Sequence, residues 1–130
     1  MKRKRRKNFE IRFYEKLLRV RPDFVHVLFC LGDAYTQKGF YKEGLEVDKR
    51  LAKLKPEDPI VHYNLACSFS LVEDIDAALR EFKKAVLLGY DDFSYIFQDA
   101  DLENLRKDAA FKEFLCKIRR LEERSRGLYK

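Results

Sequence analysis

Hydrophobic residues of similar size recur along the chain every 34 positions. Val27 corresponds to Val61, Leu31 to Leu65 and Tyr35 to Phe69, and the small residues Gly32 and Ala66 also correspond. Pro22 and Pro56, which each end a helical stretch, have the same separation. Recurrence of side-chain volume at this period indicates repeated helical hairpins. The sequence predicts a lone helix over residues 8–20, one helical pair over 24–37 and 41–54, and a second pair over 58–71 and 75–88.

The pattern changes after Tyr90. Apolar residues keep helical spacing but lose the 34-residue period, at Phe93, Ile96, Phe97, Leu102, Leu105, Phe111, Phe114 and Leu115. Asp108 is a suitable N-cap for a final helix that runs to about Arg126, with Gly127 beyond its end. A segment of this kind is expected to cover the apolar face that a further repeat would bury.

The repeated unit resembles the tetratricopeptide repeat. The matching positions are Leu31, Gly32, Tyr35, Gly39, Tyr41 and Pro56 in the first unit, and Leu65, Ala66, Phe69, Ala78, Phe82 and Ala85 in the second. The sequence departs from the pattern at Gly44, Asp48, Leu51 and Tyr90. Residues 93–130, with "DADLENLRKDAAF", resemble the segment that closes many bacterial tetratricopeptide arrays.

This resemblance implies an all-α fold, a right-handed α-solenoid with a lone N-terminal helix, two full repeats and C-terminal capping helices. The expected organisation is a basic disordered tail over residues 1–7, an array over residues 8–92 and a capping segment over residues 93–130. Within the array, the lone helix takes residues 8–21 and the repeats take residues 25–58 and 59–92.

The net charge of +6 lies entirely in one run near the N-terminus. Without its six bases, the remaining 22 Lys and Arg balance the 22 Asp and Glu. Because the rest of the chain has no net charge, we do not expect its folded surface to bind nucleic acid. The run is either a solubilising arm or a salt-sensitive contact for nucleic acid or an anionic membrane surface. The polyanion contacts would be Lys2, Arg3, Lys4, Arg5, Arg6 and Lys7.

The cysteines predict reduced thiols and a cytoplasmic protein. Cys30, Cys67 and Cys116 are odd in number and widely spaced. The basic start lacks the uninterrupted apolar stretch of a signal peptide, and no apolar run approaches the length of a bilayer span. We therefore expect a protein that does not span a membrane.

Two histidines lie close to cysteines, which raises the question of a metal site. His26 and Cys30 are four residues apart and share a helical face, whereas His62 and Cys67, five apart, do not. A zinc site needs a third and usually a fourth ligand, and the sequence offers none beyond Asp33. Because catalytic signatures such as GxSxG and GxGxxG are absent from the sequence, we expect no metal, no cofactor and no enzymatic activity.

The resemblance implies that the first helix of each pair lines a concave groove for a peptide or protein segment. By register, the groove residues are His26, Phe29, Cys30, Asp33, Thr36, Gln37, Ile60, Tyr63, Asn64, Cys67, Ser70 and Leu71. Of the slots with which some family members clamp a terminal carboxylate, only Asn64 matches. Apolar anchoring on Phe29, Ile60 and Tyr63 is the preferred hypothesis, and the alternative is that Phe29 and Tyr63 pack between helices and bind nothing.

The sequence thus predicts a non-enzymatic adaptor whose partner is a protein or peptide. The alternative is an anionic-polymer or membrane-surface binder that uses the Lys/Arg arm, with the helical body mediating oligomerisation. The lone N-terminal helix offers Phe9, Ile11 or Phe13 on its outer side, so it either caps the array or pairs two copies as a homodimer.

Overall fold

The protein is built from helices. A computed structural model describes residues 8–127, and within this range all regular secondary structure is helical. The helices are α2 (Phe9–Val20), α3 (Val25–Gln37), α4 (Tyr41–Leu54), α5 (Pro59–Leu71), α6 (Ile75–Leu87), α7 (Phe93–Ile96), the 3-10 helix η1 (Ala100–Leu102), α8 (Glu103–Arg106) and α9 (Ala109–Ser125). The five helices from α2 to α6 begin and end within one residue of the ranges predicted from the sequence.

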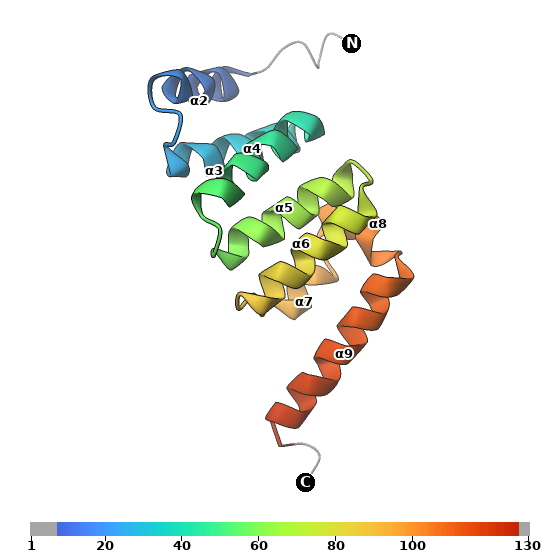
Figure 1. Ribbon diagram of the computed structural model, residues 1–130. Helices are drawn as coiled ribbons and strands as arrows, with labels where there is room; N and C mark the ends of the chain where they lie inside the picture. Colours follow the sequence, from blue (N-terminus) through green and yellow to red (C-terminus); the bar gives the residue numbers. More distant parts are fainter. Residues whose placement is uncertain (1–7, 128–130) are drawn as a thin grey trace.

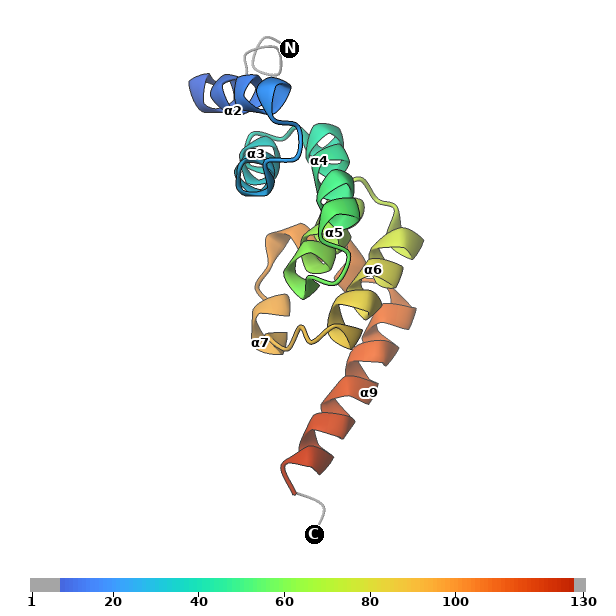
Figure 2. The same cartoon turned by 60° about the vertical axis from the view of Figure 1, so that its left-hand side comes forward.

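The helices stack as consecutive hairpins. Helix α3 pairs with α4, α5 pairs with α6, α4 packs on α5, and α2 covers the free side of α3 (Figure 1). The same stack seen from a second direction forms an elongated body from which α9 projects at one end (Figure 2). Within residues 8–127 the main contacts join each hairpin to its neighbours, which is the arrangement of a solenoid.

The 34-residue period is visible in the backbone hydrogen bonds of the two hairpin turns. In the first turn the amide of Phe40 donates to the carbonyl of Tyr35 at 2.8 Å, and in the second the amide of Asp74 donates to the carbonyl of Phe69 at 2.9 Å. Both turns pass through a left-handed residue, Gly39 at φ 85° in the first and Glu73 at φ 67° in the second. The turn geometry is therefore repeated even where the residue type is not.

Local sequence fixes the starts of four helices. Asp58 accepts a hydrogen bond from the amide of Ile60 at 2.9 Å at the start of α5, and Pro59 occupies the first turn, where its missing N–H costs nothing. Asn8 caps α2, Asp74 caps α6 and Asp108 caps α9 in the same manner. The predicted role of Asp108 is confirmed, and Gly127 follows α9 with φ 77°.

Two apolar clusters form the core. One joins α2, α3 and α4 and includes the fully buried Ile11, Leu28 and Leu51. The other joins α5 and α6 to the C-terminal helices around Phe82, whose ring centroid lies 4.9 Å from that of Phe111. Burial of large apolar side chains on both sides of every hairpin provides most of the stability.

The segment from α7 to α8 closes the second hairpin. The side chain of Ser70 on α5 accepts a hydrogen bond from the amide of Leu105 at 3.1 Å, and its carbonyl accepts one from the Asn104 side chain at 3.0 Å. Ile96, Leu102 and Leu105 are fully buried in this contact. Helix α9 then leaves the body, and Phe111 is the one residue along it that is fully buried.

Candidate functional site

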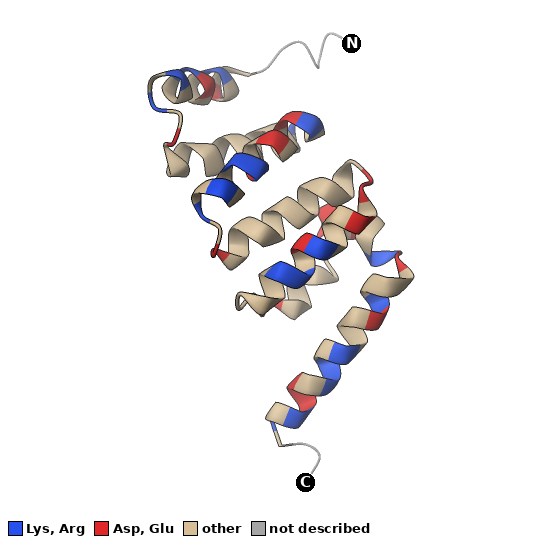
Figure 3. Ribbon diagram, in the orientation of Figure 1, with Lys and Arg blue, Asp and Glu red and all other residues tan. Residues whose placement is uncertain are grey.

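A cavity of about 210 Å³ opens on the surface shared by α3, α5 and the segment that follows α7. Its walls come from the first helix of each hairpin and from residues 95–101, so the closing segment forms one side of it. The lining residues are Gly32, Asp33, Thr36, Gln37, Asp48, Tyr63, Asn64, Cys67, Ser68, Leu71, Tyr95, Asp99 and Asp101. Helix α5 carries no Lys, Arg, Asp or Glu of its own, whereas charged residues are frequent along α2, α4, α6 and α9 (Figure 3).

Asp99 ties the closing segment to α5. The Tyr63 hydroxyl donates a hydrogen bond to Asp99 Oδ2 at 2.6 Å, and the Cys67 thiol lies 3.6 Å from the same oxygen. Asp99 Oδ1 accepts from the amide of Asp101 at 3.0 Å. The Tyr63 ring stacks on that of Tyr90 with centroids 4.4 Å apart. Burial raises the pKa values of the Tyr63 phenol and the Cys67 thiol, so both stay protonated and serve as donors.

Asp48 brings a carboxyl group to the floor of the cavity from α4. It is buried and accepts a hydrogen bond from the Ser68 hydroxyl of α5. Burial raises the pKa of Asp48 to about 7, the Ser68 hydrogen bond opposes this shift, and the nearby charge of Asp33 adds to it. Gly32 leaves the room that the carboxyl occupies, because a Cβ at this position would lie 3.1 Å from Asp48 Oδ1.

The cavity has an acidic lining. Asp33, Asp48, Asp99 and Asp101 contribute carboxyl groups, and none of the thirteen lining residues is a Lys or Arg. Loss of hydration raises the pKa of Asp101, with a further contribution from the charge of Asp99, and it also raises the pKa of Asp33 at the rim. Asp48 and Asp99 accept hydrogen bonds from neutral donors, but no positive charge in the lining balances the four carboxyl groups. Such a concave, partly dehydrated wall favours a cationic group in the space between them.

The structure brings seven of the twelve predicted groove residues to this cavity. They are Asp33, Thr36, Gln37, Tyr63, Asn64, Cys67 and Leu71. His26, Phe29 and Cys30 lie nearer the start of α3, and Ile60, 49% exposed, lies at the start of α5. Ser70 is not brought to the groove, because its side chain is fully buried and bonded to the Leu105 amide beneath α8.

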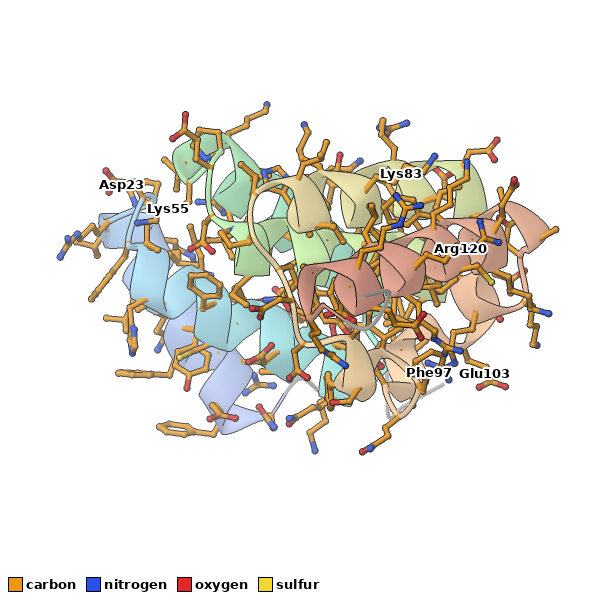
Figure 4. All side chains as sticks on the ribbon, turned by 90° about the horizontal axis from the view of Figure 1, so that it is seen from below. Asp23, Lys55, Lys83, Phe97, Glu103 and Arg120 are labelled. Atoms are coloured by element: carbon orange, nitrogen blue, oxygen red, sulfur yellow. The ribbon has the colours of Figure 1, made fainter. Side chains whose placement is uncertain are left out.

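Tyr63 does not present the free aromatic face that the anchoring hypothesis requires. It is 5% exposed, and its ring and hydroxyl are occupied by Tyr90 and Asp99. Phe29 is half-buried and packs against the core cluster of α2, α3 and α4. The alternative in which both rings pack between helices therefore describes their environment better. Exposed aromatic surface near the cavity comes from Tyr95 on α7. Phe97, which directly follows α7, is also exposed and lies at one edge of the molecule (Figure 4).

Six residues of the cavity were missed by the sequence analysis: Gly32, Asp48, Ser68, Tyr95, Asp99 and Asp101. Tyr95, Asp99 and Asp101 belong to the segment without the 34-residue period, so register alone does not place them. Asp48 could have been identified from the sequence, because it has a carboxyl group at a position where the repeat pattern has an aromatic residue. A buried polar residue at an expected core position indicates a specific partner or a site.

The second histidine of the chain, His62, is buried, and both of its ring nitrogens have partners within the protein. His62 Nδ1 lies 2.8 Å from Glu81 Oε1, and His62 Nε2 lies 2.7 Å from the carbonyl oxygen of Pro56. A carbonyl oxygen only accepts, so Nε2 carries a proton, and a further proton lies between Nδ1 and Glu81 Oε1. The buried pair joins α5 to α6 and to the loop before α5, and it does not face the cavity.

Among the described residues, no group of three or more His, Cys, Asp or Glu is arranged to hold a metal ion. No helix in residues 8–127 is long and apolar enough to cross a membrane. The predicted polyanion contacts of residues 2–7 lie outside the described part of the chain.

Stacked two-helix hairpins with a 34-residue period and a concave face formed by the first helices define a tetratricopeptide-like α-solenoid. The structure of MamA (residues 41 to the end) from Desulfovibrio magneticus RS-1 has the same fold. It superposes on 87% of this chain and 66% of that one with a TM-score of 0.64, at 19% sequence identity. The all-α solenoid predicted from the sequence is thus confirmed.

The sequence is also similar to a chloroplastic protein from Arabidopsis thaliana. The two are 36% identical over 87 residues, which is 65% of this chain and 26% of that protein. The chain thus matches about a quarter of the relative's length. No protein-family profile matches the sequence. The relative's name places that protein in the chloroplast, which does not support the cytoplasmic location predicted here from the cysteines.

Proposed function

We propose that the protein is a non-enzymatic interaction adaptor that binds an extended segment of a partner protein across the concave face of α3 and α5. The observation that carries the proposal is the acidic cavity on that face, where four aspartates line about 210 Å³ of space without a base among them. A Lys or Arg side chain of the partner is the group that complements this lining.

The polar atoms at the rim suit a partner in extended conformation. Asn64 is half-buried on α5 and Gln37 is exposed on α3, so their amides reach the cavity from its two helical walls. Side-chain amides supply both donors and acceptors, which match the peptide groups of an extended chain. Tyr95, 47% exposed, supplies an aromatic surface beside the cavity for the aliphatic stem of the basic side chain.

Charge reversal at the rim tests this proposal. Asp33 is exposed, so Asp33→Lys changes the cavity's charge without disturbing the core. Glu123 is exposed on α9 and is not part of the cavity lining, so Glu123→Lys makes the same change in net charge outside the cavity. We expect partner proteins captured by the wild type from cell extract to be lost with Asp33→Lys and retained with Glu123→Lys. Circular dichroism of both variants provides the folding control. Equal capture by all three proteins would refute binding at the groove.

A further inference from the structure

The outer face of α2 exposes a row of large apolar side chains at the N-terminal end of the solenoid. Phe9 is 83% exposed and Val20 is 87% exposed, and Phe13, one turn after Phe9, is also exposed. The rings of Phe9 and Phe13 stack with centroids 6.4 Å apart. Ile11 and Leu18 point to the opposite side, into the core. The burial of Ile11 removes it from the outer surface predicted from the sequence, and Phe9 and Phe13 remain there.

Positive charge accompanies this apolar row. Arg12, Lys16 and Arg19 are exposed along α2, with Lys16 between Phe13 and Val20 on the same face. The two carboxylates of the helix have tyrosine partners, because Glu10 accepts a hydrogen bond from Tyr14 and Glu15 accepts one from Tyr35 of α3. In the sequence, the run KRKRRK ends one residue before this helix.

We propose that the α2 face, comprising Phe9, Arg12, Phe13, Lys16, Arg19 and Val20, docks on the surface of an anionic lipid bilayer. A helix with one apolar face flanked by bases lies in the plane of the membrane interface, with its apolar side chains at the boundary between headgroups and acyl chains. The bases interact with anionic headgroups, and each contributes to attraction at the surface. The adjoining run of six bases strengthens this long-range attraction.

Charge complementarity favours a membrane over a second copy of the chain. Pairing two α2 faces about a twofold axis would bring Arg12, Lys16 and Arg19 of one copy against the same residues of the other. Helix α9 at the opposite end mixes acidic residues with a larger number of Lys and Arg (Figure 3), so head-to-tail assembly offers the bases of α2 no net negative surface. The bases of the α2 face are complemented best by an anionic surface.

The apolar content of the face favours lipid over nucleic acid. Phenylalanine rings can stack on bases, but Val20 has no π-face, and its exposed aliphatic surface gains nothing from a phosphate backbone. A bilayer interface buries both kinds of side chain together with the bases around them.

Vesicle co-sedimentation of the full chain tests this proposal. We expect binding to phosphatidylcholine vesicles that contain about 30% phosphatidylserine, and little binding to vesicles of phosphatidylcholine alone. The double variant Phe9→Ala/Phe13→Ala should bind the anionic vesicles about tenfold more weakly, because its apolar contribution is lost. The triple variant Arg12→Gln/Lys16→Gln/Arg19→Gln should lose more than tenfold.

Leu87→Ala is the matched control, because Leu87 on α6 is 85% exposed and lies outside the α2 face. This variant should bind anionic vesicles as the wild type does. The proposal is overturned if the wild type does not sediment with anionic vesicles, or if Phe9→Ala/Phe13→Ala sediments as fully as Leu87→Ala. It is also overturned if double-stranded DNA or RNA binds to the α2 face more tightly than the vesicles do and displaces them.

Discussion

Replacing Asp48 with Asn should stabilise the protein, and the gain should grow with pH. Asp48 is buried on α4, and its pKa is raised to about 7, mainly by burial, from the ordinary value of 3.8. An acid with a higher pKa in the folded state than in the unfolded state holds its proton more tightly when folded. Ionisation of Asp48 therefore lowers the free energy of unfolding of the wild type. This loss of stability is absent below pH 3.8, grows as the pH rises, and reaches its full size above pH 7.

The size of the effect follows from the shift. Each pKa unit corresponds to about 1.4 kcal/mol, and the interval from pH 5 to the folded-state pKa spans about two units. Asn has the same shape and keeps an oxygen that can accept the Ser68 hydrogen bond, but it never ionises. The free energy of unfolding of Asp48→Asn minus that of the wild type should therefore increase by roughly 2–3 kcal/mol between pH 5 and pH 8.

Urea denaturation followed by circular dichroism at pH 5, 6, 7 and 8 measures this difference. Asp91→Asn, a substitution at an exposed loop carboxyl, is the control and should differ from the wild type by the same small amount at every pH. The reasoning is refuted if the difference between Asp48→Asn and the wild type does not change with pH, or if the variant is the less stable protein at pH 8.

Three further substitutions or conditions test other parts of the account. Glu73→Gly should raise the free energy of unfolding by about 1 kcal/mol, measured by urea denaturation, because Glu73 occupies the left-handed turn position that Gly39 fills in the first hairpin. His62→Ala should lower it by about 3 kcal/mol, because the buried Glu81 then loses its 2.8 Å contact with His62 and keeps only the 3.8 Å contact with Arg80. A second change, Glu81→Gln, should recover part of the loss. Binding of a Lys-containing peptide at the cavity should weaken when the pH falls from 8 to 6, because Asp48 then gains a proton. Isothermal titration calorimetry at both pH values measures the affinity, and an affinity that does not change with pH would contradict this prediction.

Local patterns made the helices predictable from the sequence. Helix starts depend on residues that lie within a turn of each other, such as Asp58 with Pro59 or Asp108 with Phe111, and these patterns are legible without tertiary structure. The period of 34 then fixed which helices pair, because the small residues Gly32 and Ala66 recur at corresponding positions.

The cavity was only half predictable because one of its walls does not belong to the repeats. Register placed Asp33, Asn64 and their neighbours on the concave side, but Asp99 reaches Tyr63 through a segment whose path depends on packing against α5. The same packing buries Tyr63, which the sequence predicted to be an exposed anchor for a partner and which instead donates a hydrogen bond within the protein. Ser70 was also predicted to line the groove but is buried, because only the folded chain brings the Leu105 amide to its hydroxyl.

The most direct test of the central claim is selection of peptides from a random displayed library against the immobilised wild type and, in parallel, against Asp33→Asn/Asp101→Asn. Both substitutions conserve shape and remove charge from the acidic cavity. We predict that the wild type selects peptides with Lys or Arg at one fixed position, and that the variant loses this preference. Selection of peptides without a basic residue, or of the same basic sequences by both proteins, would contradict the account.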